Sequence, residues 1–261
     1  MNFWGKLVGG GLGYLLAGPW GLVIGAFFGH QFDRGLASFQ DGVMGGAHQA
    51  LAQQAFFEAT FSIMGHMAKI DGRVSEQEIA LAREVMARMG LSEQSRLLAI
   101  ELFTQGKQPG FDPNEVLTRF LQASRRARNL HQMFIEIQLH AAYADGAMDA
   151  AERGLLLSIC ETLGFSEADL DRLDAMIRAE RHAGGGGPVE KVSLDDAYAI
   201  LNITPEATDA EVKRAYRRLT SQHHPDKLVA KGLPEDMMKL AQEKTHEIRT
   251  AYERIRDSRG F

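Results

Sequence analysis

The residues best suited to bind a partner lie near the carboxyl end of the chain, on one predicted helix over residues 208–222. Lys213, Arg214, Arg217 and Arg218 form two like-charge pairs at i, i+4 spacing on that helix. Such pairs destabilise a helix slightly, so an exposed face of this composition is unexpected unless a partner uses it. These four basic residues indicate that the helix binds a partner by electrostatic attraction.

A short polar motif, His224-Pro225-Asp226, follows the basic helix directly, and Lys227 comes next. The residue before a proline disfavours helical geometry, so we expect the helix to end here. Taken alone, His224 is also compatible with a plain helix-stop role. Its functional meaning depends on the helices on either side.

Two long helices position this motif. The first begins with a capping box formed by Thr208 and Glu211, and its apolar residues follow the i, i+3, i+4, i+7 pattern of a buried face. The second runs from about residue 234 to 257, and a shorter helix capped by Ser193 and Asp196 precedes both. The sequence predicts an antiparallel pair with a polar loop at its tip. The predicted buried positions are Leu194, Ala197, Ile200, Leu201, Val212, Ala215, Tyr216, Leu219, Leu240, Ala241, Ile248, Ala251, Tyr252 and Ile255.

In this order, the segments DAYAILNI, AEVKRAYRRLTSQHHPDK and EIRTAYERIRD resemble a J domain of the DnaJ family. The resemblance implies a helical hairpin that binds the ATP state of a DnaK-type chaperone and accelerates its ATP hydrolysis. The implied roles are triggering for His224, Pro225 and Asp226, docking on the chaperone's acidic surface for Lys213, Arg217 and Arg218, and assistance in docking for Arg214 and Lys227.

The middle of the chain, residues 46–182, is an internal duplication. A shift of 74 residues places 66–94 on 140–168, with the Asp-Gly turns, the capping residues and the helix-ending glycines in register. In the second copy Asp149 and Glu152 form a predicted capping box, and Gly164 suits the left-handed position after that helix. The repeat predicts one pseudo-symmetric α-helical domain.

Four carboxylates of this repeat are candidate metal ligands: Asp71, Glu78, Asp145 and Glu152. Oxygen ligands suit a hard divalent cation, but each of these residues also has a turn or capping role, and the full calcium-loop spacing is absent. The repeat resembles the TerB-like family of tellurite-resistance-type domains, because both copies carry the pattern DG-x-x-x-x-x-E. That resemblance names no metal.

Residues 7–29 carry no charge and predict a transmembrane helix over 7–30. The segment is longer than the apolar core of a signal peptide. Lys6 before it and the Asp33–Arg34 pair after it leave the charge rule without a decision. We expect residues 1–6 on the periplasmic side and residues 31–45 as a connector in the cytosol, where a J domain meets an ATP-consuming chaperone.

Small residues recur at every fourth position of this segment. On a helix they form one face that lets two backbones approach closely, so we expect a homodimer through the membrane helix. The simpler interpretation is that glycine is merely frequent here, since three further glycines lie off the stripe. The stripe residues are Gly5, Gly9, Gly13, Ala17, Gly21, Gly25 and Gly29.

A linker at 183–192, with four consecutive glycines and Pro188, separates the repeat from residues 193–261. The whole all-α arrangement resembles the DjlA family of membrane-anchored, DnaJ-like co-chaperones. The resemblance implies an inner-membrane co-chaperone with a regulatory role, associated with envelope-stress and capsule signalling. The Gly/Phe-rich segment and the C-x-x-C repeats of DnaJ are missing, which argues against a general holdase.

The composition of the chain argues against several other classes of function. A net charge of −5 and a pI of about 6.0 argue against a nucleic-acid partner. A single cysteine, Cys160, excludes an intramolecular disulfide and a multi-cysteine zinc module. We expect no cofactor and no enzymatic activity, because nucleophile motifs and phosphate loops are absent. The alternative is a membrane-tethered metal or ligand sensor that uses the repeat and relays its output through the J domain, which a metal titration of the repeat would distinguish.

Overall fold

The computed structural model describes residues 43–70, 86, 89–144, 146–183 and 192–261, and all regular structure within these ranges is helical. The predicted all-α class is therefore confirmed. The predicted membrane span with its small-residue stripe, the linker residues 184–191, and Asp71, Glu78 and Asp145 lie outside the described residues. Among the helices that are described, none combines the length and the apolar character needed to cross a membrane.

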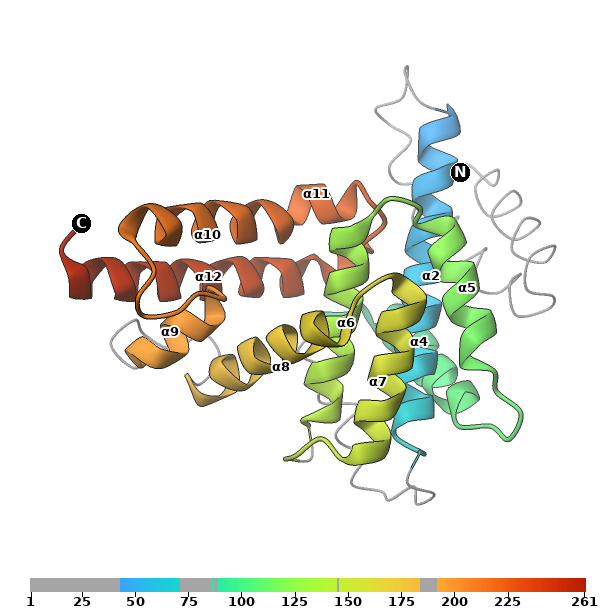
Figure 1. Ribbon diagram of the computed structural model, residues 1–261. Helices are drawn as coiled ribbons and strands as arrows, with labels where there is room; N and C mark the ends of the chain where they lie inside the picture. The colour runs from blue at the N-terminus through green and yellow to red at the C-terminus, as the bar shows by residue number, and fades with distance from the viewer. Residues whose placement is uncertain (1–42, 71–85, 87–88, 145, 184–191) are drawn as a thin grey trace.

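Six of the described helices form the first body, most of them on the right in Figure 1. Their interior contains a cluster of aromatic rings in which Phe56 meets Phe120 and Phe134 edge-on, at centroid distances of 5.7 and 6.3 Å. The helices are α2 (Val43–Met67), α4 (Glu93–Gly106), α5 (Pro113–Ala123), α6 (Arg128–Ala142), α7 (Ala150–Leu163) and α8 (Glu167–His182).

The internal duplication is visible in the positions where the helices start. Helices α4 and α8 begin 74 residues apart, and each is capped at its N-terminus by a serine, Ser92 or Ser166. The predicted capping box of Asp149 and Glu152 opens α7, and Gly164 ends it in the left-handed conformation with φ 76°. These local predictions are confirmed because each depends only on residues within one turn of the helix end.

The second body contains α9 (Leu194–Ile200), α10 (Asp209–Gln222), α11 (Pro225–Val229), a 3-10 turn at Glu235–Met237, and α12 (Met238–Arg259). Helices α10 and α12 lie antiparallel and side by side (Figure 1), as predicted. Tyr216 stacks on Tyr252 between them, with centroids 4.3 Å apart. Both tyrosines, and Leu194 and Leu240, are only partly buried, whereas the sequence predicted full burial.

The loop between α10 and α12 is less polar in its contacts than the predicted polar tip. Leu228 and Leu233 are fully buried, and both belong to the hydrophobic core of the first body. Gln49 and Gln53 of α2 donate to the carbonyls of Val229 (3.0 Å) and Leu233 (3.4 Å). The loop is therefore packed against α2, and its polar residues alternate with apolar anchors.

Gly232 makes this close packing possible. Its φ of 115° is a conformation that favours glycine. A Cβ at this position would lie 2.5 Å from the Cβ of Ala52 in α2. The backbone of Gly232 thus packs directly against the side chain of Ala52, and no space remains for a further carbon atom.

Candidate chaperone-docking site

Helix α10 carries the basic residues, and its local sequence explains its start and its orientation. Thr208 and Glu211 form the predicted capping box: the Thr208 amide donates to Glu211 Oε2 at 2.7 Å, and the Glu211 amide donates to Thr208 Oγ1 at 3.3 Å. Val212, Ala215 and Leu219 are buried in the hairpin. Burying this apolar face turns the charged residues outward.

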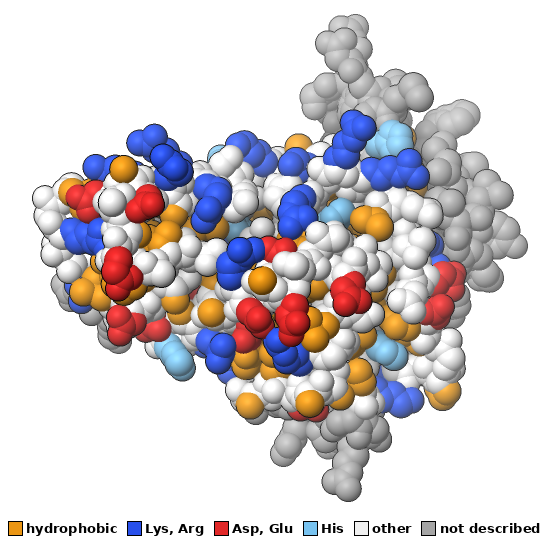
Figure 2. All heavy atoms as spheres, viewed as in Figure 1, with side chains coloured by type: hydrophobic (Ala, Val, Ile, Leu, Met, Phe, Trp, Pro, Cys, Tyr) orange, Lys and Arg blue, Asp and Glu red, His pale blue; other side chains and the backbone are white. Residues whose placement is uncertain are grey.

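The outward face of α10 presents three exposed arginines, Arg214, Arg217 and Arg218. None of them forms an ion pair with a described residue. Figure 2 shows Lys and Arg side chains along the edge of the molecule formed by α10 and α11. Lys213 differs from its neighbours, because it is half-buried and its ammonium lies 4.6 Å from the ring centroid of Phe261. Lys227 is exposed and donates to Ser221 Oγ at 2.6 Å.

The motif residues lie at the junction of α10 and α11. His224 is exposed at the N-cap of α11, Pro225 is its first residue, and Asp226 is exposed in its first turn. Two buried side chains bracket the motif, since His223 is 1% exposed and Leu228 is fully buried. The exposed triad is therefore held in one position by the packing on both sides of it.

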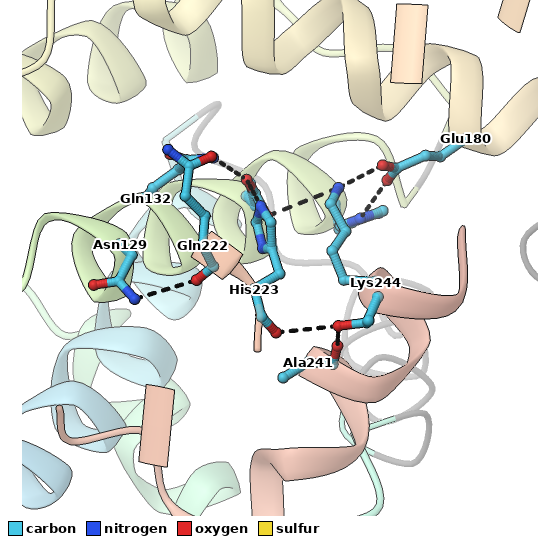
Figure 3. Close-up of polar contacts among 10 residues, drawn as sticks. Asn129, Gln132, Glu180, Gln222, His223, Ala241 and Lys244 are labelled. Atoms are coloured by element: carbon cyan, nitrogen blue, oxygen red, sulfur yellow. Dashed lines mark hydrogen bonds and ion pairs between the residues drawn. The ribbon is translucent and has the colours of Figure 1, made fainter. Parts of the chain in front are cut away.

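His223 points into a buried ionic cluster between the two bodies (Figure 3). Its Nε2 lies 3.6 Å from Glu136 of α6. The ammonium of Lys244, on α12, lies 2.5 Å from Glu180 of α8 and 3.7 Å from Glu136. His140 approaches the other side of Glu180 at 3.6 Å. Apart from His140, each of these side chains is at most 5% exposed.

The protonation equilibria of this cluster are shifted by burial and by the neighbouring charges. Burial opposes ionisation of Glu180, but the Lys244 charge and the contact with His140 lower its pKa to about 2. Burial also works against the charged form of Lys244, yet the carboxylates of Glu136 and Glu180 raise its pKa above the ordinary value. Burial lowers the pKa of His223, against the attraction of Glu136.

The sequence analysis missed this cluster, although each member left a signal. Lys244 falls in the apolar stripe of its own helix, between Ala241 and Ile248. Glu180 extends the α8 stripe that includes Ile177. A charge in an apolar stripe indicates a buried partner, but the sequence does not say which one.

Of the four candidate metal ligands, Glu152 alone lies within the described residues. Glu152 serves in the capping box of α7, where its carboxylate accepts from the Asp149 amide at 2.8 Å. Within the described ranges no group of three or more His, Cys, Asp or Glu side chains is arranged to hold a metal ion. Asp71, Glu78 and Asp145 lie outside these ranges.

Three family models match consecutive parts of the chain. The model described as the co-chaperone DjlA transmembrane domain matches residues 1–39. The model of the tellurite resistance protein TerB matches residues 57–175, and the DnaJ domain model matches residues 196–259. These matches confirm the three kinds of domain expected from the sequence, with the transmembrane domain at the N-terminus.

Curated relatives match over the whole chain. A co-chaperone protein DjlA from Coxiella burnetii is 45% identical, with 100% of both chains covered. Proteins of the same name from Shewanella oneidensis and Escherichia coli K12 are 43% and 39% identical, again with 100% of both chains covered. No solved structure gives a significant match.

The buried cluster predicts a pH-dependent stability that one residue controls. Burial and the Glu180 charge raise the pKa of Glu247, on α12, from 4.5 to about 8. Between these values the folded chain holds a proton that the unfolded chain releases, so this group's contribution to stability falls as the pH rises. We expect Glu247→Gln to raise the free energy of unfolding at pH 8.5 by on the order of 1 kcal/mol, and to have little effect at pH 5.

Urea unfolding of the detergent-solubilised chain, followed by circular dichroism at both pH values, measures this effect. Asp257→Asn is the control, because Asp257 lies ten residues further along the same helix with a side chain that is 58% exposed. An equal change at pH 5 and pH 8.5 in the Glu247 variant would contradict the assignment.

Proposed function

Because the chain belongs to the DjlA family of co-chaperones, we propose that its J domain binds the ATP state of a DnaK-type chaperone and accelerates ATP hydrolysis. The observation that carries the proposal is the triad of His224, Pro225 and Asp226, with His224 and Asp226 exposed, beside the unpaired arginines of α10. The triad would trigger hydrolysis, while Arg217 and Arg218 dock on the acidic surface of the chaperone. Lys213, Arg214 and Lys227 have supporting parts in this proposal.

The charge distribution supports docking by electrostatic attraction. A basic face directed at an acidic surface accelerates the encounter and aligns the two partners, and the effect weakens with salt. Lys213 is better suited to positioning α10 than to direct contact, because its ammonium already lies over the Phe261 ring. Arg217 and Arg218 have no such competing contact among the described residues.

The proposed role is regulatory. A single cysteine in the sequence leaves no place for the paired C-x-x-C repeats that DnaJ carries beside its J domain. Client choice would then depend on where the membrane anchor and the TerB-like domain place the J domain. A role in envelope-stress or capsule signalling belongs to this proposal through the family resemblance alone.

Replacing His224 tests the trigger. We expect His224→Gln to lower the stimulated ATPase rate of the chaperone at least tenfold, because the substitution removes the imidazole from the proposed contact. The unfolding temperature should stay within about 2 °C, since an exposed side chain contributes little to packing. Single-turnover ATP hydrolysis with purified full-length chain measures the rate. His246→Gln, at an exposed histidine of α12, is the matched control. Normal stimulation by the His224 variant would remove the triad from the mechanism.

The small-residue stripe carries a further proposal, a homodimer through the membrane helix. Leucine at Gly13, Gly21 or Gly25 should separate two closely packed backbones and lower the dimer fraction several-fold. Crosslinking in native membranes reports that fraction. Gly11→Leu is the control, because Gly11 lies off the stripe, and equal loss at Gly11 would contradict a stripe-specific dimer.

The proposed location is the bacterial inner membrane, with a short periplasmic N-terminus and the remaining chain in the cytosol. The flanking charges do not decide the orientation, so the proposal depends on access of the J domain to a cytosolic chaperone. Protease added to sealed spheroplasts should leave residues 193–261 intact until the membrane is permeabilised. Digestion of this segment in sealed spheroplasts would overturn the orientation and separate the J domain from its proposed partner.

A further inference from the structure

The basic face of α10 does not end at the border of the J domain. A cleft of about 230 Å³ runs between α10 and the TerB-like helices α6 and α8. Arg218 lines it from α10, while Arg128 and Arg172 line it from the other side. The side-chain amide of Asn129, on α6, donates to the carbonyl of Gln222 at 3.2 Å. This hydrogen bond joins α6 to the end of α10 beside the cleft.

The charges in this cleft are unbalanced. Its one carboxylate, Asp169, is bonded to Arg172, lies 3.6 Å from Arg128, and accepts from the Ser166 amide at 2.9 Å. Arg218 has no ion-pair partner among the described residues. Three guanidinium groups against one carboxylate leave an excess of two positive charges beside the docking helix.

A second basic segment lies just before the start of α6. Arg125 and Arg126, in the turn between α5 and α6, are exposed and form no ion pair with a described residue. Lys231 of the J domain donates to the side chain of Asn129, which lies on α6 three residues after Arg126, at 2.7 Å. Arg126 has a φ of 64°, a conformation that an arginine adopts at some cost.

The two sets of arginines have a fixed spatial relationship. The buried ion pairs of Lys244 with Glu136 and Glu180 hold the J domain on α6 and α8. The TerB-like arginines therefore lie at constant positions relative to the exposed triad. A partner that docks on α10 at Arg218 therefore also lies beside Arg128 and Arg172.

We infer that Arg126 and Arg172 of the TerB-like domain belong, with Arg217 and Arg218, to one composite docking surface for the acidic face of the DnaK-type chaperone. This inference depends on the proposed function. A chaperone is favoured over an anionic membrane as the occupant because the surface is continuous with the triad. The net charge of the whole chain is −5, so this local excess of arginine does not reflect a generally basic protein.

The test compares two arginines of the same helix. Arg172 and Arg178 both lie on α8, with side chains 55% and 57% exposed, and each pairs with an aspartate of that helix. Arg172 lines the cleft, and Arg178 does not. The full-length chain in neutral detergent is titrated with the chaperone in its ATP state at 50 and 300 mM salt.

Arg172→Glu and Arg126→Glu should each weaken binding about threefold at 50 mM salt and less than about twofold at 300 mM. Arg178→Glu should stay close to wild type at both concentrations. Arg172→Gln, which avoids a new repulsion with Asp169, should give a smaller loss in the same direction. Unchanged thermal unfolding separates lost binding from lost structure.

The outcomes separate this inference from the proposed function. If the wild-type chain stimulates the chaperone but Arg172→Glu, Arg126→Glu and Arg178→Glu bind equally, the composite surface is overturned and the J-domain function stands. If the wild-type chain gives no stimulation, the proposed function fails first. If the variants lose binding only to vesicles of anionic lipid, the surface is a membrane contact and the inference is wrong.

Discussion

One constraint orients the two bodies of this protein: a lysine and two glutamates must share a space from which water is excluded. Removing a single carboxylate or ammonium from water costs several kcal/mol unless an opposite charge compensates it. Lys244 of the J domain meets that condition only when Glu136 and Glu180 surround it. Sliding or rotating one body would leave buried charges without partners, so one arrangement is selected. The position of the exposed triad follows from that selection.

The features predicted correctly from the sequence are those that depend on interactions between residues close together in the chain. Capping residues such as Ser166 and Thr208, the left-handed glycine at Gly164 and the apolar stripe of α10 all act within a few residues of one another, and the structure shows each as expected. The contact between the bodies joins residues up to 180 positions apart, as in the bond from Gln49 to Val229. No local pattern identifies such partners. The charges in the apolar stripes indicate only that partners exist.

The loop after the triad shows how composition misled the prediction. Lys227, His224 and Asp226 are polar, so the segment was expected to be a polar loop. Leu228 and Leu233, beyond these residues, are fully buried. Alternation of exposed charge with buried leucine is the pattern of a segment packed along one side, and it presents His224 and Asp226 to solvent. The position of the triad after α10 was predicted from the sequence, whereas the surface that supports the triad was not.

Helix α8 contributes residues to the hydrophobic cores of both bodies, so the domain boundary does not separate two independent cores. It begins in the capping box of the repeat and ends with Ala179 in the hydrophobic core of the J domain. A peptide bond broken between Ala183 and Val192 would therefore cut the chain without exposing either core. The two fragments would stay associated, and His224 would keep its place relative to α6. The two parts of this protein would remain one structural unit after the chain between them is cut. Proteolysis of the linker would therefore not release a separate J domain.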